Sequence, residues 1–346
     1  MKKIAVGLSG GVDSSVVLLL LKEQGYDVTG VHMQCWDYNE EGCTGEQDKA
    51  DAVSICTQLE VPFKFLDFQI EYQEKVIQNF YDEYEAGRTP NPDILCNQEI
   101  KFGLFLDWAL LNGFDMVATG HYAKVSLEDS PRLFIPKDRS KDQTYFLYRL
   151  TSEKLEKIMF PLGDLIKDEV KQIAFQNNLK NFNKPESMGI CFIGKINVRD
   201  FLKRRLKEKT GEVLNIKGEV IGRHKGVPFY TIGQRHGFEI YKYTGNSLYV
   251  IEKNADRNTL VVGTEEEAKV SSFFISDISF INENIEGSIE LFVRIRHLGD
   301  LYKASLVFEK GSASVTLQER VFGIAPGQSC VIYSENYQVL GGGIIQ

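Results

Sequence analysis

Short apolar runs alternate with longer amphipathic stretches through about the first 120 residues of the chain. The apolar runs predict β-strands at Lys3–Leu8, Val28–Met33, Phe63–Phe68 and Met116–Thr119. Between them, apolar residues recur three or four positions apart, which predicts helices at Ser14–Gln24, Asp48–Leu59, Tyr72–Tyr84 and Ile100–Leu111. Because strands that alternate with helices form parallel sheets, the pattern predicts an α/β fold with an N-terminal doubly wound parallel sheet.

The pattern changes twice further along the chain. Residues 141–182 read as mostly helical, with Thr151 or Ser152 as an N-cap. After about residue 245, short segments such as Leu291–Arg296 alternate apolar with polar residues and are separated by turns, which predicts a C-terminal all-β barrel. We therefore expect three domains, an α/β domain at 1–197, a small basic central domain at 198–268 and a β-barrel domain at 269–346.

The acidic net charge of the chain conceals a basic segment. The chain carries 40 Lys and Arg against 48 Asp and Glu, a net charge of −8, which argues mildly against a nucleic-acid partner. Residues 195–242, however, hold 12 basic and five acidic side chains, so this segment is +7 and the remainder −15. A nucleic acid contacts one face only, so an RNA partner stays open. The basic run Lys203–Lys207 fits phosphate contact and a solvated helix face equally well.

Apolar runs and cysteine usage indicate the compartment. The chain has no run of 18 apolar residues, so we expect no membrane partner. Its six cysteines form no C-x-x-C pair and its five histidines are scattered, which predicts a reducing, cytoplasmic location and no metal site of the protein's own. The cysteines are Cys35, Cys43, Cys56, Cys96, Cys191 and Cys330.

The strongest motif is Gly7-Leu-Ser-Gly-Gly-Val-Asp-Ser-Ser15, between an apolar strand and a helix. Backbone N–H groups at such a helix start bind phosphate, and Gly10 and Gly11 allow it to approach the backbone. No Gly-Lys-Ser/Thr follows, so this is not a Walker A loop. A glycine-rich turn without a ligand is the alternative. Asp13 is either a first-turn carboxylate favoured by the helix dipole or a ligand of Mg²⁺ on the phosphates.

Two cysteines lie in unusual surroundings. Cys96 ends the proline-rich segment Thr89-Pro-Asn-Pro-Asp-Ile-Leu-Cys96, in which Asp93 offers a carboxylate for proton transfer. Cys191 lies in the apolar segment Gly189-Ile-Cys-Phe-Ile-Gly194. Taken alone, a cysteine in an apolar run is usually a small core residue.

The motifs together resemble the tRNA-specific 2-thiouridylase family of the PP-loop ATP pyrophosphatase superfamily, which thiolates the wobble uridine of tRNA. The resemblance runs from the N-terminus to Pro326-Gly-Gln328. It departs from the family at Gly237–Tyr241 and at Cys35–Cys43. In chain order, the motifs that carry it are Gly7–Ser15, Asn91–Asn97, Thr119–Ala123, Lys141–Leu147, Gly189–Gly194 and Thr231–Gly237.

The resemblance implies roles for individual residues. ATP would be bound by Gly7, Leu8, Ser9, Gly10, Gly11, Val12, Asp13, Ser14, Met33 and Gly120. The target base would meet Asn91, Pro92 and Asp93, with Asp93 as acid/base. Cys191 would carry a persulfide, and Cys96 would be its disulfide partner. Further tRNA contacts would come from His121, Lys141, Asp142, Gln143, Arg296, His297 and Gln328.

The resemblance also implies a reaction and its partners. ATP, with Mg²⁺, would adenylate uridine 34, and the persulfide sulfur would then replace oxygen 2. A persulfide donor such as a cysteine desulfurase or sulfur-relay protein would load the enzyme, and a thiol reductant would reset it. Two alternatives remain: a PP-loop ligase that adenylates a small molecule for amidation, and a non-catalytic nucleotide- or RNA-binding protein.

Overall fold

The computed structural model describes residues 1–36, 45–185, 191, 193, 197–241 and 245–346. Cys43 and most of the Gly189–Gly194 motif therefore lie outside the described residues. Among the helices that the structure does describe, none combines the length and apolar character that crossing a membrane requires.

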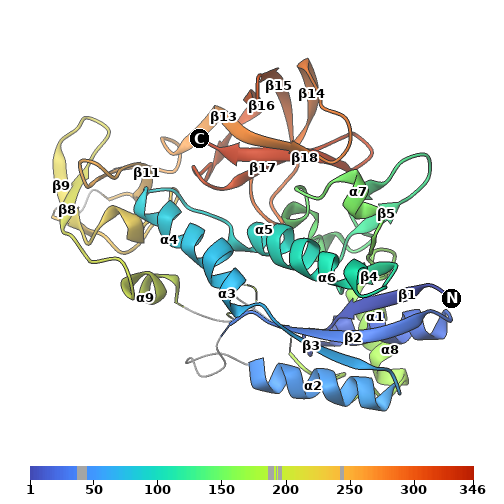
Figure 1. The fold of residues 1–346 in the computed structure, drawn as a ribbon. Coiled ribbons are helices and arrows are strands. Elements are labelled where there is room, and N and C mark those ends of the chain that lie inside the picture. The colour runs from blue at the N-terminus through green and yellow to red at the C-terminus, as the bar shows by residue number, and fades with distance from the viewer. Residues whose placement is uncertain (37–44, 186–190, 192, 194–196, 242–244) are drawn as a thin grey trace.

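A five-stranded parallel sheet organises the N-terminal half (Figure 1). Its strand order is β3-β2-β1-β4-β7, so the chain runs outward from β1 in both directions. The four predicted strands are confirmed, and β7 is added at the edge. The strands are β1 (Lys3–Gly7), β2 (Asp27–Gln34), β3 (Phe63–Asp67), β4 (Met116–Ala118) and β7 (Ile158–Met159).

Helices cover both faces of this sheet, which confirms the doubly wound architecture. Ile4 and Val6 of β1 face a core shared with α1 (Val12–Glu23), α2 (Gly45–Gln58) and α8 (Lys167–Gln176). Ala5 faces the other way, toward a core that contains α6 (Phe105–Leu111). The alternation follows from the two-residue period of a strand.

Two helices on the second face contain π-helical turns. One runs through α3 (Gln69–Tyr72), a π-helix (Gln73–Ile77) and α4 (Gln78–Glu85). The other runs through α5 (Pro92–Leu95), a π-helix (Cys96–Leu104) and α6. The predicted helix Ile100–Leu111 therefore begins earlier, at Pro92, and Cys96 lies inside it rather than in a loop.

The prediction that residues 141–182 are mostly helical is wrong. The segment holds the 3₁₀ turn Thr144–Phe146, the short helix α7 (Ser152–Leu155), strand β7 and helix α8. Tyr145, Leu147, Tyr148 and Leu150 are all buried although they are nearly consecutive, so they do not form one face of a helix. The N-cap prediction is confirmed, because the Thr151 side chain accepts a hydrogen bond from the N–H of Lys154.

A small β-sheet follows helix α9 (Val198–Lys203) in the central part of the chain. Its strand order is β10-β9-β8-β12-β11. The basic side chains from Lys203 to Arg205 are exposed at the end of α9. The strands are β8 (Gly211–Leu214), β9 (Val220–His224), β10 (Glu239–Ile240), β11 (Tyr249–Asn254) and β12 (Thr259–Gly263).

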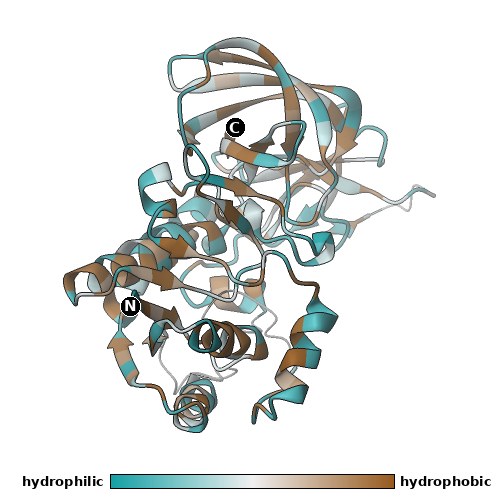
Figure 2. Ribbon diagram, turned by 90° about the vertical axis from the view of Figure 1, so that its right-hand side faces the viewer, coloured by the Kyte–Doolittle hydropathy of each residue, from teal (hydrophilic) through white to brown (hydrophobic). Residues whose placement is uncertain are grey.

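The C-terminal strands form the predicted barrel, in which apolar and polar residues alternate along the strands (Figure 2). Pairing of β13 with β18 closes it. The hairpin of β5 (Lys124–Ser126) and β6 (Arg132–Phe134), from the N-terminal half, extends the sheet beside β18. The barrel strands are β13 (Lys269–Phe280), β14 (Gly287–Arg294), β15 (Tyr302–Glu309), β16 (Ser312–Phe322), β17 (Ser329–Tyr333) and β18 (Gln338–Ile345).

A buried ion pair also joins the barrel to the N-terminal half. Arg294 Nη1 donates to Asp142 Oδ2 at 2.5 Å, and Asp142 is fully buried. Asp142 Oδ1 accepts from the backbone N–H and the hydroxyl of Thr144 at 2.9 and 2.6 Å. The carboxylate therefore has compensating partners on both oxygens, which is the condition for burying a charge.

Removing Arg294 is expected to destabilise the fold strongly. Arg294→Met leaves the Asp142 carboxylate buried without its cation, which costs about 3–5 kcal/mol. Differential scanning calorimetry checks this as a lowered apparent Tm. The control is Arg320→Met, because Arg320 pairs with Glu266 at 3.0 Å while both side chains are more than half exposed. An Arg294→Met protein as stable as the control contradicts the prediction.

Candidate functional site

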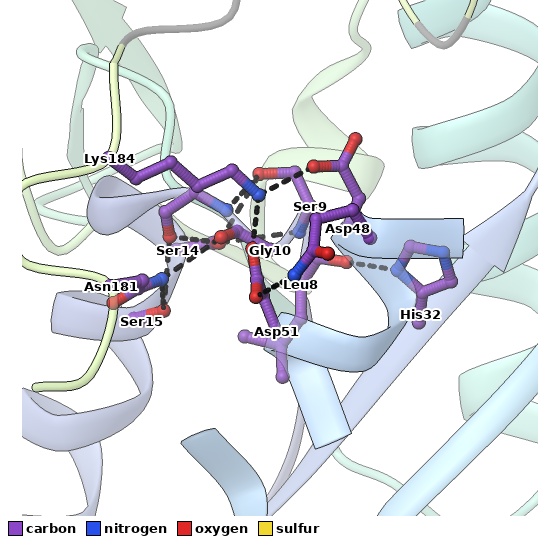
Figure 3. A network of polar contacts seen from close by, with 12 residues as sticks. Leu8, Ser9, Gly10, Ser14, Ser15, His32, Asp48, Asp51, Asn181 and Lys184 are labelled. Atoms are coloured by element: carbon purple, nitrogen blue, oxygen red, sulfur yellow. Dashed lines mark hydrogen bonds and ion pairs between the residues drawn. The ribbon is translucent and has the colours of Figure 1, made fainter. Parts of the chain in front are cut away.

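The glycine-rich loop after β1 leads directly into the first turn of helix α1 (Figure 3). Gly11 is the N-cap, and no side chain caps the helix. The hydroxyl of Ser14 donates to the Gly11 carbonyl at 3.1 Å and accepts from the N–H of Ser9 at 3.3 Å. Since first-turn N–H groups have no acceptor within the helix, the loop is suited to an anion such as phosphate.

Neighbouring segments hold this loop in place. Asn181 Nδ2 donates to the Gly10 carbonyl at 3.0 Å and to Ser15 Oγ at 2.9 Å. Nearby, Lys184 Nζ lies 2.7 Å from Asp48 Oδ1 and 2.5 Å from Asp51 Oδ2, so it ties the start of α2 to the same region (Figure 3). The loop conformation is therefore set from outside by segments distant in sequence.

Asp13 has specific partners in the structure. Lys167 Nζ lies 2.6 Å from Asp13 Oδ1 and 2.8 Å from Oδ2, and the Tyr122 hydroxyl donates to Oδ1 at 3.0 Å. The described residues contain no cluster of three or more His, Cys, Asp or Glu that could hold a metal ion. Any Mg²⁺ at this loop would be bound through the nucleotide's phosphates and the waters that the ion retains.

The segment after β4 fits closely against the loop. A Cβ atom on Gly120 would lie 3.0 Å from the backbone nitrogen of Ser14, so no larger side chain fits there without displacement. Met33, at the end of β2, is buried, and its Cε would lie 3.4 Å from a Cβ on Gly7. Both residues predicted to line an adenosine site thus lie beside the loop.

The Asn-Pro-Asp motif starts helix α5. Asn91 is its N-cap and accepts a hydrogen bond from the N–H of Asp93 at 3.2 Å, while Pro92 occupies the first turn. Both residue types are favoured at these positions. The motif thereby directs Asp93 and the following Cys96 into the core, where Cys96 is fully buried.

The backbone of Cys191 is hydrogen-bonded to side chains of two helices, α5 and α3. Its backbone N–H donates to Asp93 Oδ1 at 3.0 Å, and its carbonyl accepts from the Tyr72 hydroxyl at 2.7 Å. The Cys191 and Cys96 sulfurs lie close enough for each to shift the pKa of the other. The fold therefore brings together the two cysteines that the sequence singled out, and the structure holds both as free thiols.

Sequence reasoning missed Lys101, which lies beside both sulfurs. Its ammonium lies 3.4 Å from His121 Nε2, and its charge lowers the pKa of the Cys191 thiol. Because the π-helix bonds residue i to i+5, it places Lys101 one turn after Cys96, whereas an α-helix would turn it away. A register count that included a π-turn could have found it.

The two thiols have opposite electrostatic environments. The hydrogen bond from Cys96 and the charge of Lys101 lower the pKa of Cys191 to about 7, against the opposing effect of burial. Burial, with the neighbouring Cys191 sulfur, raises the pKa of Cys96 well above its ordinary value. Burial also raises the pKa of Asp93. Cys191 is therefore the sulfur that ionises first.

The residues predicted to contact tRNA occupy varied positions, and those roles stay predictions. His121 is buried, with Nδ1 2.7 Å from Thr119 Oγ1, and Asp142 is in the interdomain ion pair. Gln143 accepts from the N–H of Tyr122 at 2.9 Å. Arg296 is exposed, whereas Lys141 and His297 are half-buried, and His297 packs against the Phe146 ring.

Gln328 joins the barrel to the Asn-Pro-Asp segment. Its side-chain Nε2 donates to the carbonyls of Thr89 and Pro90 at 2.8 and 3.2 Å. Gly327 before it has φ +91°, and a Cβ there would lie 2.8 Å from the Thr89 nitrogen. The barrel thus fixes the backbone from which Asn91 and Asp93 project.

The parallel sheet with a phosphate-type loop at its carboxyl edge defines an α/β nucleotide-binding class of protein. A family model described as "tRNA methyl transferase HUP domain" matches residues 2–195. Models described as "tRNA methyl transferase PRC-barrel domain" and "Aminomethyltransferase beta-barrel domain" match residues 199–264 and 270–345.

Full-length relatives define the family further. The chain is 44% identical to tRNA-specific 2-thiouridylase MnmA of Staphylococcus epidermidis and 45% identical to MnmA 1 of Geobacillus kaustophilus. Each alignment covers 99% of this chain and 95% of the relative. The chain belongs to the tRNA-specific 2-thiouridylase family, which confirms the resemblance drawn from its motifs.

One solved structure shows more distant similarity. It is the U34-tRNA thiolase NcsA of Methanococcus maripaludis, 21% identical, with a TM-score of 0.37. The alignment covers 56% of this chain and 62% of that one. Similarity this low supports no conclusion about function.

Substituting Gly10 is expected to disturb the loop more than an ordinary glycine change. Gly10 has φ +74°, and a Cβ there would lie 2.4 Å from the Asp48 carbonyl oxygen. Gly25→Ala is the matched control, because Gly25 has φ +84° and open space around it. The control should lose about 1–2 kcal/mol from backbone strain alone. Gly10→Ala should lower the free energy of unfolding by about 1–3 kcal/mol more than Gly25→Ala does. Thermal unfolding measures both variants, and equal destabilisation of the two would refute the predicted clash at Gly10.

Proposed function

We propose that the protein catalyses ATP-dependent 2-thiolation of the wobble uridine of tRNA, through an adenylated uridine and a persulfide on Cys191. The observation that carries the proposal is that Cys96 and Cys191 lie close enough for each to shift the pKa of the other, in a 2-thiouridylase-family fold that also holds a phosphate-type loop. Such a pair can transfer a sulfur atom and then close as a disulfide.

ATP fits the loop by its chemistry. The helix start and the residues Gly7 to Ser14 suit its phosphates, and Met33 and Gly120, which lie beside the loop, would line the adenosine. The Thr119–His121 segment connects this loop to the thiols: Thr119 Cγ2 would lie 3.6 Å from a Cβ on Gly7, and His121 contacts Lys101. Mg²⁺ on the phosphates would neutralise charge on the departing pyrophosphate.

The proposed chemistry has three steps. Oxygen 2 of uridine attacks the α-phosphorus of ATP, and pyrophosphate leaves. The terminal sulfur of the Cys191 persulfide attacks carbon 2, and AMP leaves with the oxygen. The Cys96 thiolate then attacks Sγ of Cys191, which breaks the S–S bond, releases 2-thiouridine and leaves a Cys96–Cys191 disulfide. Asp93, whose pKa burial raises, would transfer protons at the base.

The proposal requires three partners. A persulfide donor loads Cys191, and a thiol reductant supplies two electrons and two protons to reopen the disulfide. The tRNA partner is supported by the exposed basic side chains at the end of α9. These partners, together with the cytoplasmic location expected from cysteine usage, stay predictions.

A PP-loop ligase acting on a small molecule is the less favoured alternative. It accounts for the phosphate-type loop but gives no role to two thiols in contact or to the Lys101 ammonium beside them. Pyrophosphate release that depends on a small acid and is indifferent to tRNA would support it instead.

Replacing the two cysteines separately should give different outcomes. With ATP, tRNA and a persulfide donor, Cys191→Ser should form no 2-thiouridine, because the sulfur has no carrier. Cys96→Ser should accumulate a tRNA–protein adduct linked through Cys191 that a thiol reductant releases, because the S–S bond cannot be cleaved internally. Nucleoside mass spectrometry and denaturing gels measure the two effects.

Cys330→Ser is the matched control, since Cys330 is fully buried in the barrel. It should retain thiolation activity. Undiminished persulfide-dependent turnover by Cys191→Ser would overturn the role of Cys191. Thiolation by Cys96→Ser at the wild-type rate, with no adduct and no added reductant, would overturn the disulfide step.

A further inference from the structure

Lys101 places a charged group inside the thiol cluster. Its side chain extends from the π-helix that follows the Asn-Pro-Asp segment, and its ammonium lies 3.4 Å from His121 Nε2. Its charge also lowers the pKa of Cys191, so it lies near that sulfur. Burial alone would lower the pKa of Lys101, but the Cys191 and Cys96 sulfurs outweigh it, so the pKa lies above its ordinary value. The lysine is therefore a cation that these sulfurs stabilise.

His121 is suited to orient this cation. It is buried between the rings of Phe102 and Phe160, whose centroids lie 5.7 and 5.8 Å away, and burial lowers its pKa well below the ordinary value. A neutral imidazole accepts from Lys101 Nζ at Nε2. The proton is then on Nδ1, which donates to Thr119 Oγ1 at 2.7 Å.

The groups around Cys191 act in opposite directions. Lys101 and the Cys96 hydrogen bond favour its anion, whereas the Asp93 carboxylate disfavours it. Cys35 and the Tyr72 hydroxyl are also close enough to interact, and burial raises the pKa of both. Among the described groups that act on this sulfur, Lys101 is the cation that lowers the pKa of Cys191.

We propose that Lys101 is a catalytic residue for loading sulfur onto Cys191, with His121 as the positioning residue that holds its ammonium against the sulfur. The role rests on the proposed thiolation. In the loading step, the Cys191 thiolate attacks the terminal sulfur of a donor persulfide. A new S–S bond forms on Cys191, the donor S–S bond breaks, and the donor leaves as a thiolate, so no external oxidant or reductant is needed.

Alkylation of Cys191 over a range of pH tests this role without tRNA or ATP. Iodoacetamide reacts with the thiolate, so mass spectrometry of the Cys191 peptide follows its ionisation. The wild-type midpoint should be about 7. In Lys101→Met it should rise to about 8.5 or above, and the rate at pH 7 should fall about 15-fold. Loading from a persulfide donor should fall similarly and recover at high pH.

Further variants separate charge from packing. Lys101→Arg keeps the cation and should retain a midpoint near that of the wild type. Lys101→Gln provides a second neutral variant if Lys101→Met does not fold. His121→Leu should raise the midpoint by less than removal of the charge does. Lys75→Met is the control, because Lys75 pairs with Glu99 of the same π-helix but is exposed.

Each outcome bears on one proposal. An unchanged midpoint in a folded neutral variant, judged by circular dichroism and Tm, overturns the role of Lys101. If the alkylation midpoint of Lys101→Arg rises as far as that of Lys101→Met, packing rather than charge controls the Cys191 thiol. That result also overturns the role of Lys101. Failure of the wild-type enzyme to thiolate tRNA overturns the proposed function instead, because alkylation and loading are measured without tRNA.

Discussion

The close packing of Gly120 against the first turn of α1 is the constraint on which the site depends. A Cβ there would meet the Ser14 nitrogen at 3.0 Å, so a larger residue would push the segment after β4 away from the phosphate-type loop. From that contact, Thr119 and His121 extend toward Lys101, and Tyr122 reaches Asp13. One short segment thus connects the loop to the thiol cluster.

The barrel contributes to the same site from the other end of the chain. Gln328 and Gly327 hold the backbone at Thr89 and Pro90, just before the segment that carries Asp93 and Cys96. The buried Asp142–Arg294 pair fixes the barrel against the sheet. Rigid support of this kind places reacting groups more accurately than a loop alone can.

The cysteines differ because their surroundings differ, although both are removed from water to a large extent. Cys191 faces a lysine and a hydrogen-bond donor, so its anion is stabilised, whereas Cys96 loses hydration and gains no equal compensation. Environment rather than residue type therefore separates the two thiols, of which Cys191 ionises first. Sequence reasoning assigned these two roles through the family resemblance alone.

The sequence by itself determined the parallel sheet, the phosphate-type loop and the barrel, because strand and helix periodicity, glycine at special backbone positions and capping residues act locally. It could not place Lys101, since the π-helical register that turns it toward Cys96 is not visible in an apolar pattern. It also misread residues 141–182, because the nearly consecutive buried residues from Tyr145 to Leu150 follow no regular period. Tertiary structure alone decided that Cys96, Cys191 and Lys101 meet, because their contact depends on segments far apart in the chain.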